Sequence, residues 1–303
     1  MTRLPQIRLL ADGKRLHLQD GPIDLIVEAV GSEADRRAAY DAAVRRFTGL
    51  LDELCSELPL LRRVADADRC LLQGVVARRM HAAVAPFAAA HFITPMAAVA
   101  GSVAEEILGA MTGVARLDRV YVNNGGDIAL YLADGERFSV GLMDRPDASG
   151  TMRTISIDAD EPSRGIATSG RHGRSFSLGI ADAVTVLAET ASQADAAATI
   201  IANSVDLPGH PAIMRCPARD LQPDSDLGAR LVTRGVGELS EAEIAAALEA
   251  GAACARRLLA MGLIDSAILR LHGESLVVAP KAIEPTVLQA PAAASAMERL
   301  MHA

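Results

Sequence analysis

Two carboxylates in this sequence occur in settings where a ligand or a metal ion could reach them. Asp127 directly follows two glycines in the run Tyr121-Val-Asn-Asn-Gly-Gly-Asp127. Asp195 precedes Thr199 by four residues in a segment with helical spacing. The side chains of Asp195 and Thr199 therefore project from one face of that helix. A carboxylate, a hydroxyl and a nearby backbone carbonyl form a set of hard oxygen donors that suits Mg²⁺.

Two glycine-containing turns follow apolar segments and indicate a shared pocket. The first contains Gly125 and Gly126, and glycine both tolerates positive φ and lets a bulky ligand approach the backbone. The second is Thr168-Ser169-Gly170, which ends the apolar segment that begins at residue 165. Two such strand ends predict one pocket that both of them line.

Each of these residues also has an interpretation that needs no ligand. Asp127 can cap its own turn, and residues 168–170 can be a simple strand exit. Asp195 can interact with the dipole of its own helix, while the Thr199 hydroxyl bonds to a carbonyl one turn earlier. The residue types alone leave these alternatives open.

Composition excludes several classes of function. The chain has 303 residues, a formal net charge of −8, 3% aromatic residues and no tryptophan. Nucleic-acid surfaces usually need a basic face or stacking rings, so we expect no nucleic-acid partner. An acidic protein can still bind an anionic cofactor if backbone amides or a metal ion supply local positive potential.

The cysteines and the apolar segments bear on location. Four cysteines without a CxxC pair predict reduced, mostly core thiols and no zinc site (Cys55, Cys70, Cys216 and Cys254). The N-terminus lacks the apolar core of a secretory signal, which favours a cytoplasmic protein. Residues 82–104 carry no Asp, Glu, Lys or Arg, but the two prolines in this segment predict a buried helix pair rather than a membrane span.

The pattern along the chain predicts an α+β fold. Helical spacing covers residues 34–58, 67–86, 97–111, 191–205 and 241–261. Short strands cover residues 6–10, 15–18, 23–29, 119–122, 128–132, 138–142, 151–157, 165–168, 183–188, 266–271 and 275–279, while residues 208–227 are typical of a loop. We expect a mostly antiparallel sheet with flanking and buried helices in residues 1–284, as one domain or two intimately packed subdomains, followed by an Ala/Pro-rich tail at 285–303. The alanine-rich helix faces can bury within one chain or against a twin subunit, so a homodimer is an open alternative.

Four local patterns occur in an order that resembles the ApbE family, the flavin-binding proteins that include the FAD:protein FMN transferases. They are Gly101-Ser-Val-Ala104-Glu105, then Asn124-Gly-Gly-Asp127 with the following Val140-Gly-Leu-Met-Asp-Arg-Pro146, then Ala167-Thr-Ser-Gly170 with residues 171–176, and finally Val184-Thr-Val-Leu-Ala188 with Gln193-Ala-Asp195-Ala-Ala-Ala-Thr199. The resemblance covers residues 101–205 and indicates an uncharacterised cytoplasmic branch with an ApbE-like (T-fold-like) architecture.

The resemblance implies a site for FAD and Mg²⁺. It assigns the flavin to Gly125, Gly126, Asp127 and the segment Thr168-Ser169-Gly170. It assigns the metal to Ala104, through its carbonyl, and to Asp195 and Thr199. The partner would be a small-molecule flavin or a related phosphorylated ligand.

The departures from the family pattern concern the catalytic groups. The transferases carry a lysine where this chain has Glu105, and they have a histidine followed by an Asp-Pro-x-Thr-Gly loop that is missing here. His172 is the candidate acid/base, although an exposed turn histidine explains it as well. The sequence therefore supports a Mg-dependent FMN transferase or FAD pyrophosphatase, or alternatively a non-catalytic module that binds FAD or another phosphorylated heterocycle.

Overall fold

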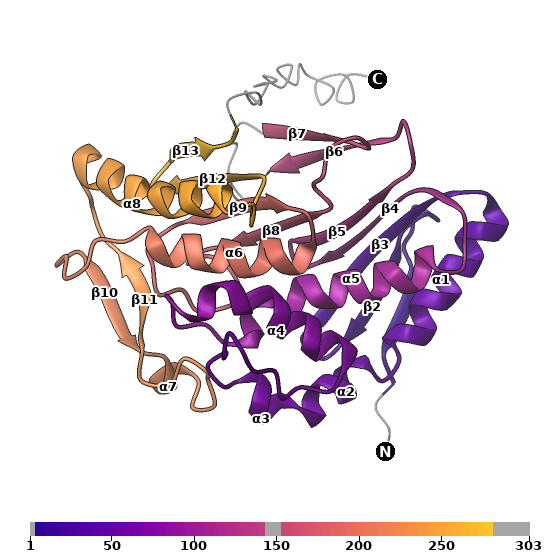
Figure 1. The fold of residues 1–303 in the computed structure, drawn as a ribbon, viewed down its shortest axis with the longest axis horizontal. Coiled ribbons are helices and arrows are strands. Elements are labelled where there is room, and N and C mark those ends of the chain that lie inside the picture. Colours follow the sequence, from indigo (N-terminus) through magenta and orange to yellow (C-terminus); the bar gives the residue numbers. More distant parts are fainter. Residues whose placement is uncertain (1–3, 143–152, 281–303) are drawn as a thin grey trace, which may run out of the picture.

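A nine-stranded antiparallel sheet forms the centre of the protein, in a computed structural model that describes residues 4–142 and 153–280 (Figure 1). The strand order is β1-β2-β3-β4-β5-β8-β9-β12-β13. The strands are β1 (Gln6–Leu9), β2 (Leu16–Asp20), β3 (Ile23–Gly31), β4 (Leu117–Asn124), β5 (Asp127–Leu132), β8 (Gly165–Ser169), β9 (Ala183–Ala188), β12 (Ser266–Leu271) and β13 (Glu274–Val278). Together with the helices described next, this sheet confirms the predicted α+β class.

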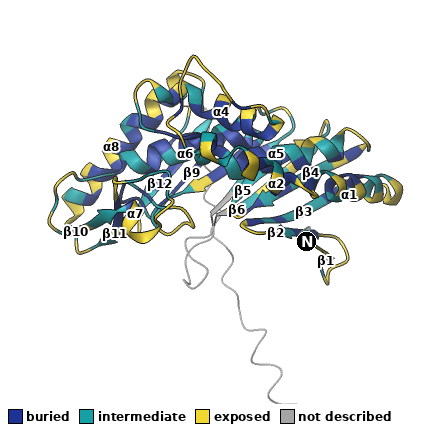
Figure 2. Cartoon of the chain, turned by 90° about the horizontal axis from the view of Figure 1, so that it is seen from below, coloured by how far each residue is buried: buried dark blue, intermediate teal, exposed yellow. Residues whose placement is uncertain are grey.

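Helices cover one face of the sheet, as Figure 2 shows. Four of them pack on strands, namely α1 (Glu33–Phe47), α5 (Val99–Thr112), α6 (Ala191–Ser204) and α8 (Glu241–Ala260). Helix α4 (Val75–Ala88) packs on α5 and α6 and adds an outer layer. In β3 every second residue from Ile23 to Ala29 is buried, because successive side chains of a strand point to opposite faces.

A separate hairpin lies on the other face of the sheet. It consists of β6 (Arg137–Leu142) and β7 (Arg153–Asp158). Its Ile157 is fully buried against Leu130, Ile166 and Leu187, which β5, β8 and β9 contribute. Among the residues that the structure describes, this hairpin covers the second face of the sheet at β5, β8 and β9, the strands next to the site.

Three helix predictions need correction at their boundaries. The segment 34–58 is not one helix, because Gly49 has a φ of 84° and interrupts it between α1 and α2 (Leu50–Ser56), with α3 (Leu58–Leu61) beyond. The segment 67–86 becomes helical only at Val75. A single 3-10 turn, η1 (Pro95–Ala98), precedes α5, where the helix was predicted to begin directly.

The segment predicted as a loop contains regular structure. Residues 208–227 hold β10 (Ile213–Pro217) and α7 (Ala218–Leu221), and β10 pairs with β11 (Leu231–Val236) in a second, two-stranded sheet. Pro217 ends β10 and precedes α7, whereas Pro223, Asp224 and Asp226 lie in turns between α7 and β11.

Two further expectations concern the cysteines and the membrane. All four cysteines are free, but the prediction of mostly core thiols is wrong, because Cys55 and Cys70 are exposed and only Cys254 is fully buried. None of the helices in the described part of the chain is both long enough and apolar enough to span a bilayer. The predicted tail at 285–303 lies outside the described residues.

Helix α6 lies at the centre of the molecule and depends on glycine where its N-terminus meets its neighbours. A Cβ atom at Gly101 of α5 would lie 2.3 Å from the Ala191 carbonyl oxygen, and one at Gly165 of β8 would lie 2.1 Å from the Thr190 carbonyl oxygen. Both distances are far below van der Waals contact. The first turn of α6 is therefore held between α5 and β8 at a separation that only glycine permits.

We expect Gly101→Ala to destabilise the protein by about 1–3 kcal/mol, because the added methyl group must push α5 away from α6. The measurement is thermal unfolding, in which each kcal/mol corresponds to roughly 2–4 °C for a chain of this size. The matched control is Gly109→Ala in the same helix, where a Cβ would meet nothing within 4 Å. That control should be neutral or stabilising, since alanine is the better helix former. Equal melting temperatures for the two variants would show that the close approach is not needed.

Candidate functional site

Asp127 begins the second strand of the β4–β5 hairpin. Gly125 and Gly126 form its two-residue turn with φ values of 66° and 114°, a backbone that side chains other than glycine adopt only with strain. Asn124 and Asp127 face each other across the hairpin. The register places both on the helix-covered face of the sheet, in line with Val122 and Ala129, which are buried under the helices.

The carboxylate of Asp127 connects two strand ends. Its Oδ1 accepts a hydrogen bond from the Thr168 amide at 3.1 Å. The two glycine-containing turns of the sequence are therefore adjacent, while the pocket that both were predicted to line stays a prediction. Asp127 does not cap its own turn in this structure, because Asn123 Oδ1 accepts the Gly126 amide at 2.8 Å instead.

Asp195 reaches from α6 to the beginning of α5. Its Oδ2 accepts the Gly101 amide at 3.0 Å, and the Ala100 amide also donates to this carboxylate. The first amides of a helix have no partner within that helix, so Asp195 supplies the acceptor that α5 lacks. The alternative in which Asp195 serves its own helix is wrong, because the helix it caps is α5.

Asp127 and Asp195 lie close enough to interact electrostatically. Burial is the main reason that the pKa of Asp127 is raised to about 7, and the Thr168 amide and Arg174 oppose this shift. Burial also raises the pKa of Asp195, and the negative charge of Asp127 raises it further. Two partly buried carboxylates side by side disfavour being ionised together, so the pair favours either a proton or a bound cation.

Glu105 makes the reciprocal contact from α5 to α6. Its Oε1 accepts the Ser192 amide in the first turn of α6 at 2.6 Å, and its Oε2 lies 3.2 Å from Nε of Arg79. Each helix thus supplies a carboxylate to the N-terminus of the other. Glu105, which departs from the resembled pattern, has a structural role in holding α6 in place.

The Thr168-Ser169-Gly170 segment is only partly oriented toward Asp127. The Thr168 amide faces Asp127, whereas its hydroxyl bonds to the Thr185 hydroxyl at 2.9 Å. Ser169 pairs with Val184 in the sheet. Packing alone explains why position 170 is a glycine, because a Cβ there would lie 2.5 Å from the Asp182 carbonyl oxygen. The flavin-binding roles predicted for this segment stay predictions.

The other two predicted metal ligands come from the same helix pair. Thr199 is partly buried on α6, and among the described residues its hydroxyl makes no hydrogen bond. The alternative in which it bonds back to its own helix is therefore not seen. Ala104 is fully buried in α5, three residues after Gly101. Their metal-binding roles stay predictions.

His172 lies beyond the strand end, at an exposed position. Its Nε2 is 3.2 Å from Oδ1 of Asp182, a carboxylate that also accepts the His272 amide and pairs with Arg171. The exposed-turn interpretation of His172 agrees with its position, and its catalytic role stays a prediction.

Two cavities lie near the central strands but do not contain the carboxylate pair. One, of about 240 Å³, is lined by Glu105, Tyr131, Arg164 and the beginning of α6 at Thr190 and Ala191. The other, of about 420 Å³, lies on the opposite face of the sheet beside Tyr121 and Phe138. Neither is lined by Asp127, Thr168 or Asp195, which meet instead at the end of the sheet that carries the β4–β5 turn.

Sequence reasoning missed one residue that helps to assemble this site. The side-chain amide of Asn124 donates through Nδ2 to the Ala100 carbonyl oxygen at 3.1 Å and connects the hairpin to the beginning of α5. Asn124 is itself buried. The signal was available, because Asn124 occupies a position of β4 where the alternation calls for an apolar residue.

The comparisons with known proteins concern families and fold. A sequence model of the family described as AbpE bacteria matches residues 7–277. A UPF0280 protein of Methanopyrus kandleri is 39% identical over 128 residues, which are 42% of this chain and 48% of that protein. A UPF0280 protein of Methanothermobacter thermautotrophicus is 42% identical over 118 residues, covering 38% and 44% of the two chains. The chain thus spans about half the length of these two relatives.

Two further comparisons cover more of the chain, one with a relative and one with a solved structure. A UPF0280 protein of Methanocella arvoryzae is 30% identical over 188 residues, which cover 60% of this chain and 71% of that protein. The crystal structure of the Pseudomonas stutzeri flavinyl transferase ApbE in its apo form superposes with a TM-score of 0.48 at 11% identity. That superposition covers 92% of this chain and 95% of the other.

We expect the wild-type protein to lose thermal stability as the pH rises from about 4 to 7 in the absence of divalent ions. The folded-state pKa of Asp127 lies above its unfolded value, so the folded protein binds the proton more tightly and ionisation destabilises it across this window. Asp127→Asn keeps an oxygen for the Thr168 amide and removes the charge. Its melting temperature should exceed that of wild type by a few °C at pH 8 and approach it near pH 4.

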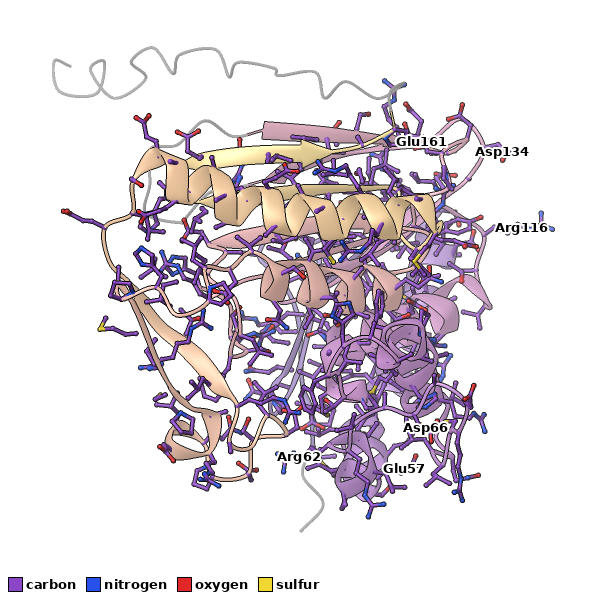
Figure 3. All side chains as sticks on the ribbon, turned by 60° about the vertical axis from the view of Figure 1, so that its left-hand side comes forward. Glu57, Arg62, Asp66, Arg116, Asp134 and Glu161 are labelled. Carbon is purple, nitrogen blue, oxygen red and sulfur yellow. The ribbon has the colours of Figure 1, made fainter. Side chains whose placement is uncertain are left out.

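The control for this pH series is Asp134→Asn. Asp134 is exposed in the turn after β5, at the other end of that strand, where Figure 3 labels it. It should reproduce the wild-type profile. Parallel wild-type and Asp127→Asn profiles would contradict a charge cost at the pair.

Glu105→Lys should lower stability by about 2–4 kcal/mol, because it removes the acceptor of the Ser192 amide and places an ammonium group beside Arg79. Glu105→Gln retains an acceptor oxygen and should lose less. Thermal unfolding of both variants measures the order. A lysine variant as stable as wild type would show that the helix contact does not depend on this carboxylate.

Proposed function

Because the chain belongs to the family described as AbpE bacteria, we propose that it binds FAD together with Mg²⁺ at the Asp127–Asp195 pair. The observation that carries this proposal is the juxtaposition of two partly buried carboxylates whose pKa values are both raised by burial. A divalent cation offsets both charges at once, and a proton offsets only one.

The residues present fit Mg²⁺ better than a metal that needs a full set of protein ligands. Within the described ranges there is no group of three or more His, Cys, Asp or Glu side chains that could hold a metal ion. Mg²⁺ commonly takes one or two carboxylates and completes its octahedron with waters and substrate phosphates. Asp127, Asp195, the Thr199 hydroxyl and the Ala104 carbonyl would be the protein donors.

The flavin would lie beside the glycine turn, on the side of Gly126. Gly125 is exposed and Gly126 partly so; a Cβ at Gly126 would meet nothing within 4 Å, whereas the Arg174 side chain lies against Gly125. The backbone of Thr168-Ser169-Gly170 lies beside this turn, because Thr168 bonds to Asp127. These residues would contact the ring or the ribityl chain, while the pyrophosphate completes the metal site.

Bound Mg²⁺ would polarise the pyrophosphate and stabilise the departing phosphate, as in other metal-assisted phosphoryl reactions. The activity would be transfer of FMN to a protein hydroxyl or hydrolysis of FAD to FMN and AMP. His172, oriented by Asp182, is the candidate acid/base. The four free cysteines fit a reducing, cytoplasmic setting.

Binding without chemistry is a second candidate function, and one observation favours it. Glu105 occupies the place of the lysine in the resembled pattern and is committed to Ser192 and Arg79. The Glu105 carboxylate places negative charge near α5 and α6, and its hydrogen bond and ion pair give it a structural role. A protein with these changes can retain the ligand and lose the transfer reaction.

We expect wild-type protein to bind FAD at least tenfold more tightly with Mg²⁺ than with EDTA, measured by flavin fluorescence. Asp195→Asn keeps an acceptor for the Gly101 amide but removes the metal-binding charge, so the Mg²⁺ effect should disappear while the fold is retained. Asp134→Asn, remote from the pair, is the matched control. FAD binding that is indifferent to Mg²⁺ and to Asp195→Asn would refute the proposed site.

Chromatography of FAD after incubation with wild-type protein and Mg²⁺ separates the two candidate functions. Appearance of FMN and AMP, abolished in Asp127→Asn and Asp195→Asn, would establish the enzyme. Intact FAD that remains bound would establish the binding module.

A further inference from the structure

The side chain of Arg174 lies directly over the glycine turn of the site. A Cβ atom at Gly125 would be 1.8 Å from Nη2 of Arg174 and 2.8 Å from its Cζ, so the guanidinium occupies the space that any other residue would need. Its Nη1 also lies 3.3 Å from the Pro22 carbonyl oxygen in the β2–β3 turn. Arg174 therefore extends from the segment after β8 across two other turns at the same end of the sheet.

The charge of Arg174 acts on the carboxylate pair without forming an ion pair. Its positive charge lowers the pKa of Asp127 against the stronger effect of burial. Within residues 4–142 and 153–280, however, no carboxylate oxygen lies within 4 Å of its nitrogens. Arg171 and Arg79, by comparison, are paired with Asp182 and Glu105. Arg174 is also exposed, so much of its hydrogen-bonding capacity faces solvent.

Other sources of positive potential at this end of the molecule are already used. The first amides of α5 are bound by Asp195, and the Ser192 amide of α6 is bound by Glu105. A Mg²⁺ ion balances the two carboxylates of the pair and leaves nothing to balance additional phosphate charge. A guanidinium presents several N–H donors in a planar fork that matches phosphate oxygens.

We propose that Arg174 binds the phosphate of the metal-bound ligand and makes the site specific for phosphorylated ligands over their unphosphorylated counterparts. This inference rests on the proposed function and names the residue that would select the ligand class. Gly125 is needed for this arrangement, since its lack of a side chain leaves room for the Arg174 guanidinium near Asp127.

The test compares FAD with riboflavin, which has the same ring and no phosphate, in the presence of Mg²⁺. Arg174→Gln should weaken FAD binding about 10- to 100-fold and change riboflavin binding less than twofold. Arg174→Lys should recover part of the FAD affinity, because an ammonium keeps the charge but not the fork. FAD binding to wild type should fall more steeply with salt than FAD binding to Arg174→Gln.

The matched control is Arg116→Gln. Arg116 is also exposed, and it precedes β4, whereas the glycine turn follows that strand; Figure 3 shows it at the edge of the molecule. It should bind both flavins as wild type does. Unchanged FAD affinity in Arg174→Gln would overturn the inference, and so would an equal loss of FAD and riboflavin, which would mean that Arg174 only shapes the turn.

Magnesium pyrophosphate provides a second probe that does not depend on flavin. If it raises the melting temperature of wild type but not of Arg174→Gln, while FAD fails to bind, the phosphate role stands and the flavin proposal fails. An equal increase in both proteins overturns the phosphate role alone. No stabilisation of wild type by either ligand overturns both.

Discussion

The reciprocal capping of helices α5 and α6 is the interaction on which the rest of this structure depends. Amides at the beginning of a buried helix need acceptors, and here each helix receives one from the other, through Asp195 and Glu105. The contact requires the two backbones to approach so closely that only glycine fits at position 101. Because α5 packs on β4 and β5 while α6 packs on β8 and β9, this one contact joins the two halves of the core.

The same contact creates the electrostatic character of the site. Capping α5 brings Asp195 toward Asp127, which the hairpin turn presents on the same face of the sheet. Burial makes ionisation of both carboxylates unfavourable, and the positive charge of Arg174 offsets only part of the rise in the pKa of Asp127. A carboxylate pair whose ionisation is disfavoured in this way is suited to a cation, and the guanidinium above Gly125 is suited to an anion carried by that cation.

Family membership says what kind of protein this is, whereas only the local geometry bears on the role of a single residue. The match over residues 7–277 places the chain in a family, whereas the roles of individual residues depend on what each side chain contacts. Glu105 shows why this distinction matters. A change that looks like the loss of a catalytic cation in the sequence is, in the structure, the carboxylate that positions the first turn of α6 beside Asp127's strand.

Hydrophobic periodicity and glycine turns, which are local properties of the chain, were enough to predict the α+β class and most strand positions, whereas Asp195 was assigned to the site of Asp127 only by the resemblance to the ApbE family. The sequence did not predict the break at Gly49 or the β10–β11 pair, since a left-handed residue and a partner strand gain their advantage only from packing. The capping of α5 by Asp195, the capping of α6 by Glu105 and the position of Arg174 over Gly125 arise from packing between distant segments. Each of these contacts joins residues far apart in the sequence, and no local preference specifies which distant donor a carboxylate or guanidinium will meet.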